Sequence, residues 1–367
     1  MTEPDPKPEP EPTENPSLSV VAPSPPAAQS EEGTAPVLVT DLASKTLAVK
    51  EGETFLYSDL EGNLDHGGDF GLGLYSHDTR YLSHFRMRVT GGGLVLLSSS
   101  AERGYMSHVD LTNPDLYEGD ALRAPQQTIN VRRIRAIYGH LFERIRIKNY
   151  NPTDVTLEIQ LRFGADFADI FDVRGMTHRH SGGSHTPSVA DSVIEFVHEG
   201  RDRIRRMTRI RFGVEPDRID VEDALATYQT RLLVVSVEPI LGTEDDRAAP
   251  NFDHAVHELR RSYEEWERES TQIVTDNELF NQLLDRSLRD LRALYTRVGE
   301  GGVLAAGIPW YVTIFGRDSL IASHQLLAVN TRPAREALEL LAARQGTEEN
   351  DWRDEQPGKI LHEVRDG

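Results

Sequence analysis

The residue types best suited to chemistry gather in two segments near the end of the sequence. The first, residues 308–319, reads IPWYVTIFGRDS. Trp310 offers a flat apolar face on which the C–H groups of a sugar ring can stack. Arg317 and Asp318 place a rigid fork of donors beside a pair of acceptor oxygens, which suits neighbouring hydroxyl groups. Asp318 could equally cap a helix that begins there, with Arg317 as its ion-pair partner.

The second segment, residues 345–363, reads QGTEENDWRDEQPGKILHE. It combines carboxylates, basic groups and one aromatic ring in a loop, a composition that fits a polar ligand cleft. The alternative interpretation is a solvated, charged loop. The candidate binding residues in this segment are Trp352, Arg353, Asp354, Glu355, Lys359 and Glu363.

Composition restricts the partners that this chain of 367 residues can have. Its formal net charge is -20, whereas nucleic acids and anionic membrane surfaces attract clusters of Lys and Arg. No apolar run approaches the roughly 20 residues that a membrane helix needs. We therefore expect neither a nucleic-acid nor a membrane partner, and a neutral ligand such as a sugar fits the charge.

The chain has no cysteine, which excludes disulfides, zinc–thiolate sites and cysteine nucleophiles. The absence suits a reducing compartment, and the acidic N-terminus lacks the charged-then-apolar pattern of a secretory signal. We therefore expect a cytoplasmic protein. His178, His180 and His185 lie in a Gly/Ser-rich stretch without carboxylates at ligand spacing, so a loop is expected there, and neither a metal nor a cofactor is expected in the protein.

Two pattern changes divide the chain into three predicted parts. Residues 1–44 are rich in Pro and Glu and have too little apolar surface to offset the entropy of ordering, which predicts a disordered tail. Residues 45–245 alternate apolar and polar types between Gly, Asp and Pro turns, which predicts an antiparallel β-sandwich. Within it, residues 142–150 and 155–163 flank an Asn-Pro turn signal and are predicted to form a hairpin.

Residues 246–367 follow the helical period. A capping box over residues 275–278 is predicted to begin the second helix, and a long loop is expected over residues 299–317. Helices are also expected over about 319–329 and 333–344. The residues spaced for one face of the second helix are Leu279, Leu283, Leu284, Leu288, Leu291 and Tyr295.

Both chemistry-bearing segments resemble signature blocks of a known enzyme family. IPWYVTIFGRDS and ARQG…NDWRDEQPGKILHE look like the two N-terminal signature blocks of the helical catalytic domain of bacterial amylo-α-1,6-glucosidase (glycogen-debranching) proteins. That domain is an (α/α)6 barrel, similar to those of glucoamylases and trehalases. Upstream, GLYSHDTR at residues 73–80 and FGADFADIFDVRG at residues 163–175 are similar to the β-domain that accompanies it.

The resemblance implies a glycosidase that acts on an α-glucan with inversion. It implies that Arg317 and Asp318 hold a glucose unit in the −1 subsite, that Trp310 lines this subsite, and that the second segment adds further walls. Inverting enzymes use one carboxylic acid and one carboxylate, and in the related domains both lie well downstream of the Arg-Asp pair. We therefore expect an incomplete barrel, with the catalytic acid and base beyond residue 367 and an inactive chain.

Two alternatives stay open at the level of sequence. One is a non-catalytic carbohydrate-binding protein built on the β-sandwich. The other is a related glycosidase with a different substrate, such as a trehalase-like enzyme. The residues present fix neither the glycosidic linkage nor the oligomeric state.

Overall fold

A computed structural model describes most of the chain as part of one compact unit, which spans Val39–Gly367. The predicted tail, the predicted boundary near residue 245 and residues 177–184 of the histidine-containing stretch lie outside the described residues. The structure describes residues 46–65, 71–89, 93–101, 104–176, 185–242, 251–299 and 301–365.

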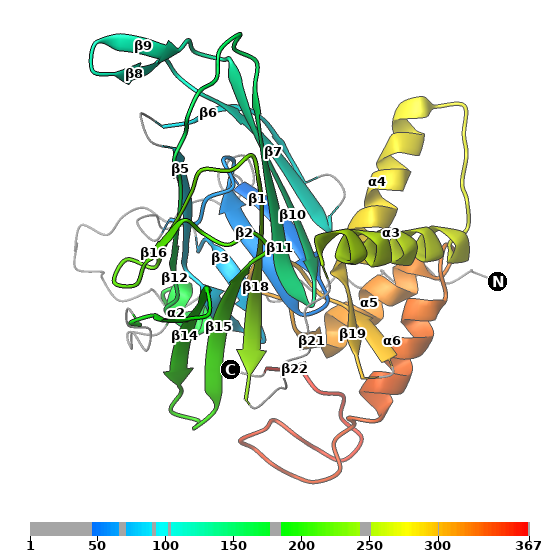
Figure 1. Cartoon of the computed structure of the whole chain (residues 1–367). Helices are drawn as coiled ribbons and strands as arrows, with labels where there is room; N and C mark the ends of the chain where they lie inside the picture. The colour runs from blue at the N-terminus through cyan, green and yellow to red at the C-terminus, as the bar shows by residue number, and fades with distance from the viewer. Residues whose placement is uncertain are drawn as a thin grey trace, which may run out of the picture. The chain divides into compact units, whose positions relative to one another are not determined.

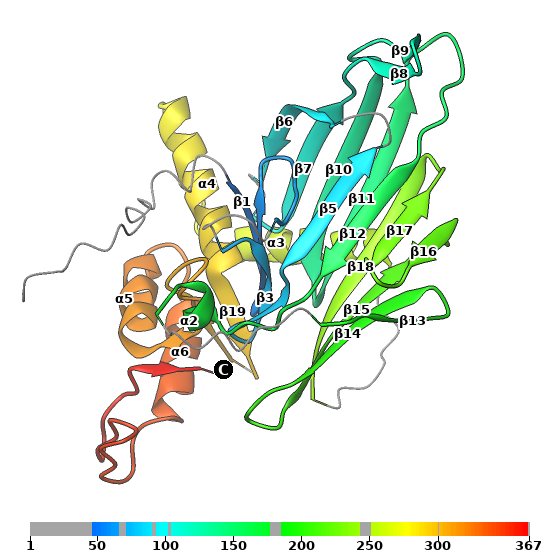
Figure 2. The same ribbon diagram turned by 90° about the vertical axis from the view of Figure 1, so that its left-hand side faces the viewer.

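Two layers of antiparallel sheet confirm the predicted β-sandwich (Figures 1 and 2). One layer is an eight-stranded sheet with the spatial order β13 (Ser188–Ala190), β14 (Val193–Glu199), β15 (Arg205–Phe212), β18 (Leu232–Leu241), β11 (His140–Asn149), β10 (Ile129–Tyr138), β7 (Met106–Thr112) and β6 (Val95–Ser100). The other layer holds two four-stranded sheets, β1 (Thr46–Glu51), β2 (Thr54–Asp59), β3 (Gly73–Ser76), β4 (Thr79–Leu82), and β16 (Arg218–Asp220), β17 (Leu225–Tyr228), β12 (Ile159–Gly164), β5 (His84–Val89). The hairpin β8 (Leu116–Glu118) and β9 (Ala121–Ala124) stands apart from them.

Inward-pointing side chains from both layers form one large hydrophobic core. Ile145 of β11 and Val235 of β18 contribute from the eight-stranded sheet, and Phe85 of β5 and Leu161 of β12 contribute from the opposite layer, all at most 1% exposed. Each such side chain stabilises the fold by about 1.5–3 kcal/mol through removal from water. The core therefore fixes how the two layers face each other.

The predicted hairpin over residues 142–163 is wrong. β11 pairs with β10 and β18, whereas β12 pairs with β5 and β17 in the other layer. The connection between β11 and β12 therefore crosses from one layer to the other. Both strands do have a buried face, but alternation specifies which face is buried and says nothing about which strand lies alongside.

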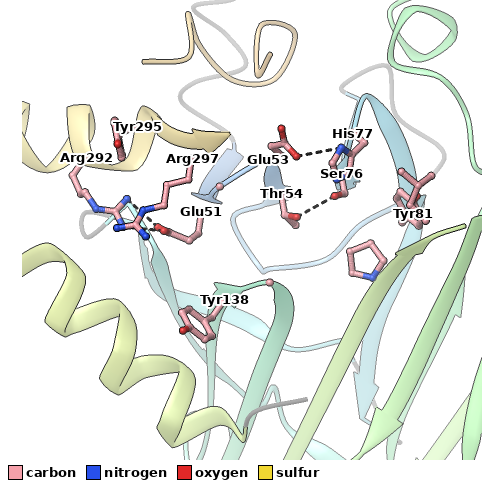
Figure 3. A pocket seen from close by; sticks show the side chains of 14 residues that line it. Glu51, Glu53, Thr54, Ser76, His77, Tyr81, Tyr138, Arg292, Tyr295 and Arg297 are labelled. Carbon is pink, nitrogen blue, oxygen red and sulfur yellow. Dashed lines mark hydrogen bonds and ion pairs between the residues drawn. The ribbon is translucent and has the colours of Figure 1, made fainter. Parts of the chain in front are cut away.

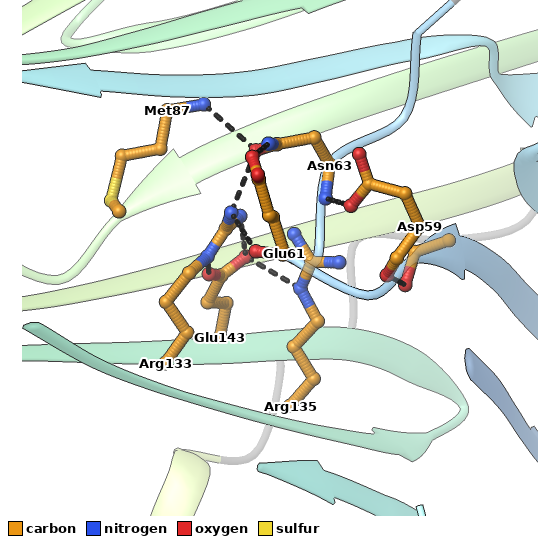
Figure 4. Close-up of polar contacts among 8 residues, drawn as sticks. Asp59, Glu61, Asn63, Met87, Arg133, Arg135 and Glu143 are labelled. Carbon is orange, nitrogen blue, oxygen red and sulfur yellow. Dashed lines mark hydrogen bonds and ion pairs between the residues drawn. The ribbon is translucent and has the colours of Figure 1, made fainter. Parts of the chain in front are cut away.

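Three charged side chains lie inside the sandwich (Figure 4). Arg133 and Arg135 of β10 and Glu143 of β11 are each 1% exposed. The Nε atoms of the two arginines donate to the carboxylate oxygens of Glu143 at 2.5 and 2.8 Å, and Arg133 Nη1 donates to Asn63 Oδ1 at 2.8 Å. Burial alone would raise the pKa of Glu143, but the two guanidiniums outweigh burial and hold that pKa below its ordinary value.

Among the described residues, four helices of more than two turns follow the sandwich, while the short α2 (Ile170–Val173) lies within the β part. Leu259 and Tyr263 of the first of these helices, α3 (Phe252–Glu269), pack against Tyr105, Met106 and Ala136, on the outer face of the eight-stranded sheet. No helix in the described ranges combines the length and apolarity needed to cross a membrane. The four are α3, α4 (Glu278–Leu294), α5 (Gly316–Leu326) and α6 (Arg332–Ala342).

The start of α4 differs from the predicted capping box. Its N-cap is Asn277, whose side chain accepts from the Phe280 amide at 3.1 Å. Thr275 Oγ1 instead accepts from the Asn277 amide at 3.2 Å, in the turn before the helix. Both Thr and Asn cap helices well. The three-residue spacing from Thr275 to Glu278 favours Thr275, whereas the structure uses Asn277.

The apolar stripe of α4 is only half covered. Its C-terminal part, Leu288 and Leu291, packs with Trp266. Its N-terminal part is open to solvent, with Leu279 77% and Leu283 60% exposed. The helix therefore buries one half of the face that the sequence predicts.

Strand β20 (Gly301–Leu304) lies in the segment predicted as a long loop and forms a hairpin with β19 (Tyr295–Val298). Tyr295, predicted on the face of the second helix, begins β19. Val303 of β20 packs with Ala337 and Leu341 of α6. The short strand β21 (Ile314–Phe315) then leads into α5 and pairs with β22 (Glu363–Val364). The hairpin thus supports the α5–α6 pair that the sequence predicts.

A buried lysine joins the sandwich to α4. Lys50 Nζ donates to the carbonyl oxygens of Gly52 at 2.7 Å and of Ala293 at 3.1 Å, and to Thr296 Oγ1 at 2.8 Å. Ala293 lies in the last turn of α4, where backbone carbonyls have no partner inside the helix. Burial lowers the pKa of Lys50 to about 7.

We predict that Glu143→Gln lowers the free energy of unfolding by about 3–5 kcal/mol, because it leaves two buried guanidiniums without a counter-ion. Urea denaturation monitored by circular dichroism measures this change. The control is Glu222→Gln at an exposed position, which should shift the free energy by less than about 0.5 kcal/mol. Equal changes in the free energy of unfolding for the two variants would contradict the role assigned to Glu143.

A second prediction concerns pH. The folded-state pKa of Lys50 is about 7, below the unfolded value of about 10.4, so between these values the unfolded chain binds more protons than the folded one. The free energy of unfolding should therefore rise from pH 7 to pH 9, by up to about 1.4 kcal/mol per pH unit. Lys50→Met should remove the part of this rise that is due to Lys50. If the free energy of unfolding of that variant rises with pH as steeply as that of the wild type, the prediction is refuted.

Candidate functional site

The first predicted segment supplies a short strand and the opening turn of a helix. β21 runs into α5 with Phe315 at the N-cap position and no side-chain cap. Asp318 therefore lies within the first turn, and the alternative that it caps the helix is wrong. Its carboxylate lies 3.7 Å from Arg317 Nε, and the two side chains are 38% and 72% exposed. A donor fork and an acceptor pair thus stand side by side at the surface.

A two-stranded ribbon brings the two predicted segments together. β22 pairs with β21 so that Glu363 lies opposite Phe315, and the Gly316 amide donates to the His362 carbonyl at 3.0 Å. A Cβ on Gly316 would collide with the carbonyl oxygen of Leu361. The absence of a side chain at Gly316 therefore allows the two segments to lie this close together. Glu363 is thereby placed beside the residue that opens α5.

Arg365 ties this ribbon to the sandwich. Its Nη1 donates to Asp78 Oδ1 at 2.9 Å, its Nη2 to the Trp310 carbonyl at 3.3 Å, and its Nε to Glu363 Oε2 at 3.1 Å. The guanidinium also lies 4.7 Å from the centre of the Phe171 ring, within reach of a cation–π interaction. One side chain therefore connects four parts of the chain that are distant in sequence.

The ring of Trp310 is packed against the β part of the chain. It joins a cluster that contains Phe55, Tyr75 and Ile170. Arg174, which follows α2, places its guanidinium 5.9 Å from the centre of the Trp310 ring and 5.6 Å from that of Tyr311. Its Nη2 also lies 3.3 Å from the Tyr311 hydroxyl. The sandwich therefore holds the aromatic end of the first segment in one orientation.

The middle of the second segment forms a loop after α6 (Figure 1). Trp352 is 96% exposed there. Lys359 Nζ donates to Asp354 Oδ1 at 2.6 Å, and this hydrogen bond holds the pKa of the Asp354 carboxyl below its ordinary value. Trp352, Asp354 and Lys359 are thus presented to solvent on a loop that makes hydrogen bonds within itself.

Glu355 and Arg353 belong to the same loop. Glu355 Oε1 accepts from the Thr347 amide at 3.0 Å, and Arg353 Nη1 lies 3.6 Å from Glu355 Oε2. Their contacts stabilise the loop, whereas Glu363 is the one candidate binding residue of the second segment that the β21–β22 ribbon places next to the first segment.

Sequence reasoning missed Asp78, Arg174 and Arg365 as members of this cluster. Asp78 and Arg174 lie in the two upstream blocks that carried the family resemblance, so a signal for them was present. Arg365 follows the second segment and has no distinguishing neighbour. Its importance comes from contacts with Asp78 and Trp310, which no local pattern specifies.

We predict that Arg365→Ala detaches the ribbon from the sandwich. Asp78 is buried, with a side chain 4% exposed, so loss of its cationic partner should be costly. Hydrogen–deuterium exchange of amides in β21 and β22 should accelerate at least ~10-fold. Arg353→Ala is the control because its side chain is 67% exposed. If both variants exchange like the wild type, Arg365 does not hold the ribbon.

Comparison with solved structures gives weak overall similarity. A protein named as a kojibiose phosphorylase from the human microbiome aligns with a TM-score of 0.48 and 9% identity, over 74% of this chain and 42% of that one. A bacterial glucoamylase complexed with acarbose aligns with a TM-score of 0.49 and 10% identity, over 82% of this chain and 51% of that one. This chain therefore spans about half the length of these proteins.

Comparison with known sequences gives a defined family. No curated protein matches this sequence. Residues 49–234 match a family model described as the N-terminal domain of (some) glycogen debranching enzymes. The matched range contains nearly all of the sandwich, from β1 into β18, and just over half of the chain. The chain therefore belongs to the family of glycogen-debranching-enzyme N-terminal domains.

Proposed function

We propose that this chain is the N-terminal part of a glycoside hydrolase of the amylo-α-1,6-glucosidase type, which acts on branches of an α-glucan in the cytoplasm. The observation that carries the proposal is the convergence at Arg365 of the two chemistry-bearing segments and the sandwich. The family to which the sandwich belongs supports the same chemistry. A cysteine-free, acidic chain suits both the proposed compartment and a neutral ligand.

In this proposal, Arg317 and Asp318 hold one glucose unit by hydrogen bonds to neighbouring hydroxyl groups. Their charged groups stand 3.7 Å apart at the surface, close enough to reach adjacent hydroxyls of one ring. Trp310 forms a wall of the same subsite, and Glu363 accepts from a further hydroxyl. Trp352, Arg353, Asp354, Glu355 and Lys359 complete the pocket from the loop.

The general acid and base are proposed to come from outside these 367 residues. A general acid of an inverting glycosidase needs a raised pKa, which an apolar surrounding provides. Asp354 has a lowered pKa beside Lys359, and Glu363 accepts from Arg365 at 3.1 Å. The surroundings of Asp354 therefore do not suit an acid that must be protonated near neutral pH, and Glu363 is already bound by Arg365.

Further helices are proposed to complete an (α/α)6 barrel. The open half of the α4 stripe supports this, because Leu279 and Leu283 are more than half exposed. Exposed apolar residues in a row usually mark a surface that another element or partner covers. The four helices described would then be the first members of the barrel.

We predict that Asp318→Ala lowers kcat/KM about 10- to 100-fold in the complete reading frame, since an acceptor to a sugar hydroxyl contributes about 1.5–3 kcal/mol. Hydrolysis of glycogen limit dextrin, isomaltose and trehalose measures the effect and ranks the substrates. Asp285→Ala, at an exposed position of α4, is the control.

Activity of Asp318→Ala within twofold of the wild type would exclude Asp318 from the sugar site. Oligosaccharide binding without turnover by the complete protein would instead favour a non-catalytic carbohydrate-binding protein. Trehalose as the preferred substrate would favour a trehalase-like enzyme.

A further inference from the structure

A cavity of about 370 Å³ lies where the sandwich meets the α4–β19 corner (Figure 3). The β1–β2 turn, the β3–β4 turn, the β10–β11 turn and the end of β18 line it, together with residues of α4 and β19. Its volume falls within the range of about 300–1,000 Å³ that is usual for pockets holding small ligands. None of the residues proposed above for the glucose subsite belongs to its lining.

The charges that face this cavity are balanced. Two carboxylates, Glu51 and Glu53, and two guanidiniums, Arg292 and Arg297, line it. Arg292 Nη2 lies 2.9 Å from Glu51 Oε1, and His77 Nδ1 lies 3.2 Å from Glu53 Oε2. An anionic ligand would meet the carboxylates and a cationic ligand the guanidiniums, so the lining suits a neutral ligand.

The lining also matches the surface of a sugar. Both donor and acceptor groups line it, and the buried hydroxyls of Thr54 and Ser76 lie 3.1 Å from each other. Figure 3 shows Arg297, an exposed residue of β19, beside the Arg292–Glu51 pair. The aromatic ring of Tyr138 adds an apolar face against which ring C–H groups can pack.

We propose that this cavity is a second carbohydrate site, which binds one or two units of a neutral oligosaccharide. The choice of an α-glucan among neutral sugars rests on the proposed function. The site is built from the sandwich and α4 together, so it differs from the subsite around Arg317 and Asp318 in both position and residues.

The β3–β4 turn connects this cavity to the subsite. His77 and Asp78 form the two central positions of the turn with φ angles of 45° and 57°, a left-handed conformation that strains residues other than glycine and is often retained where function requires it. His77 faces the cavity, while Asp78 accepts from Arg365 at 2.9 Å. A sugar in the cavity would thus lie against the turn that anchors the β21–β22 ribbon.

Hydrogen–deuterium exchange of the 367-residue chain with and without maltotriose tests the proposal. Maltotriose should protect amides in residues 51–54, 76–78 and 295–297. Arg297→Gln should raise the apparent Kd at least ~10-fold by removing a charged donor, and Glu53→Gln should weaken binding as a second, independent variant. The control is Arg146→Gln, an exposed residue of β11, which should bind like the wild type.

The outcomes separate this site from the proposed glucose subsite. Protection of these segments should persist in Asp318→Ala, since Asp318 lies outside the cavity. The second site is overturned if maltotriose does not protect the wild type, or if it protects Arg297→Gln and Glu53→Gln as strongly as the wild type. Either result leaves the role of Asp318 untouched. Protection by inorganic phosphate but not by maltotriose also overturns it, because the cavity would then be an anion site.

Discussion

The amino group of Lys50 lies where strand β1 reaches the last turn of α4, and it meets carbonyl groups that the helix itself cannot satisfy. The neighbouring residue, Glu51, binds Arg292 of the same helix at 2.9 Å. Two successive positions of one strand therefore fix both the end and one face of α4. Because β19 begins directly after α4, the α4–β19 corner and the hairpin that supports α5 and α6 depend on this junction.

The sandwich takes part in the candidate site and does more than carry the helices. Asp78 anchors Arg365, and Arg174 holds Tyr311 beside Trp310. Both partners come from the sandwich, although the candidate sugar ligands lie in the helical part. The part of this chain that matches the N-terminal domain family thus orients Trp310 and Tyr311, which belong to the same segment as the proposed sugar ligands Arg317 and Asp318.

The turn at His77 and Asp78 links the two inferred sugar sites. Its left-handed backbone is unfavourable for both residues, and contacts on both sides stabilise it. Glu53 pairs with His77 on the cavity side and Arg365 pairs with Asp78 on the ribbon side. A chain bound in the cavity and a chain end bound near Asp318 would therefore contact the same rigid support.

The sequence by itself determined the kinds of structure and predicted the kinds of chemistry. Alternation of apolar and polar residues predicts the sandwich, the change of period near residue 251 predicts the helices, and the residue types around Arg317 and Asp318 predict a surface for hydroxyl groups. These features depend on local spacing, because side-chain direction repeats every two residues in a strand and every 3.6 residues in a helix.

Only the tertiary structure decided which segments meet. β11 and β12 are joined by a connection that contains a turn signal, yet they lie in opposite layers. Glu363 lies opposite Phe315 although two helices, α5 and α6, and a long loop separate them. Arg365 gains its partners in the same way. Pairing between distant segments depends on the burial and hydrogen bonding of the whole fold, so residue types and spacing could not specify these contacts.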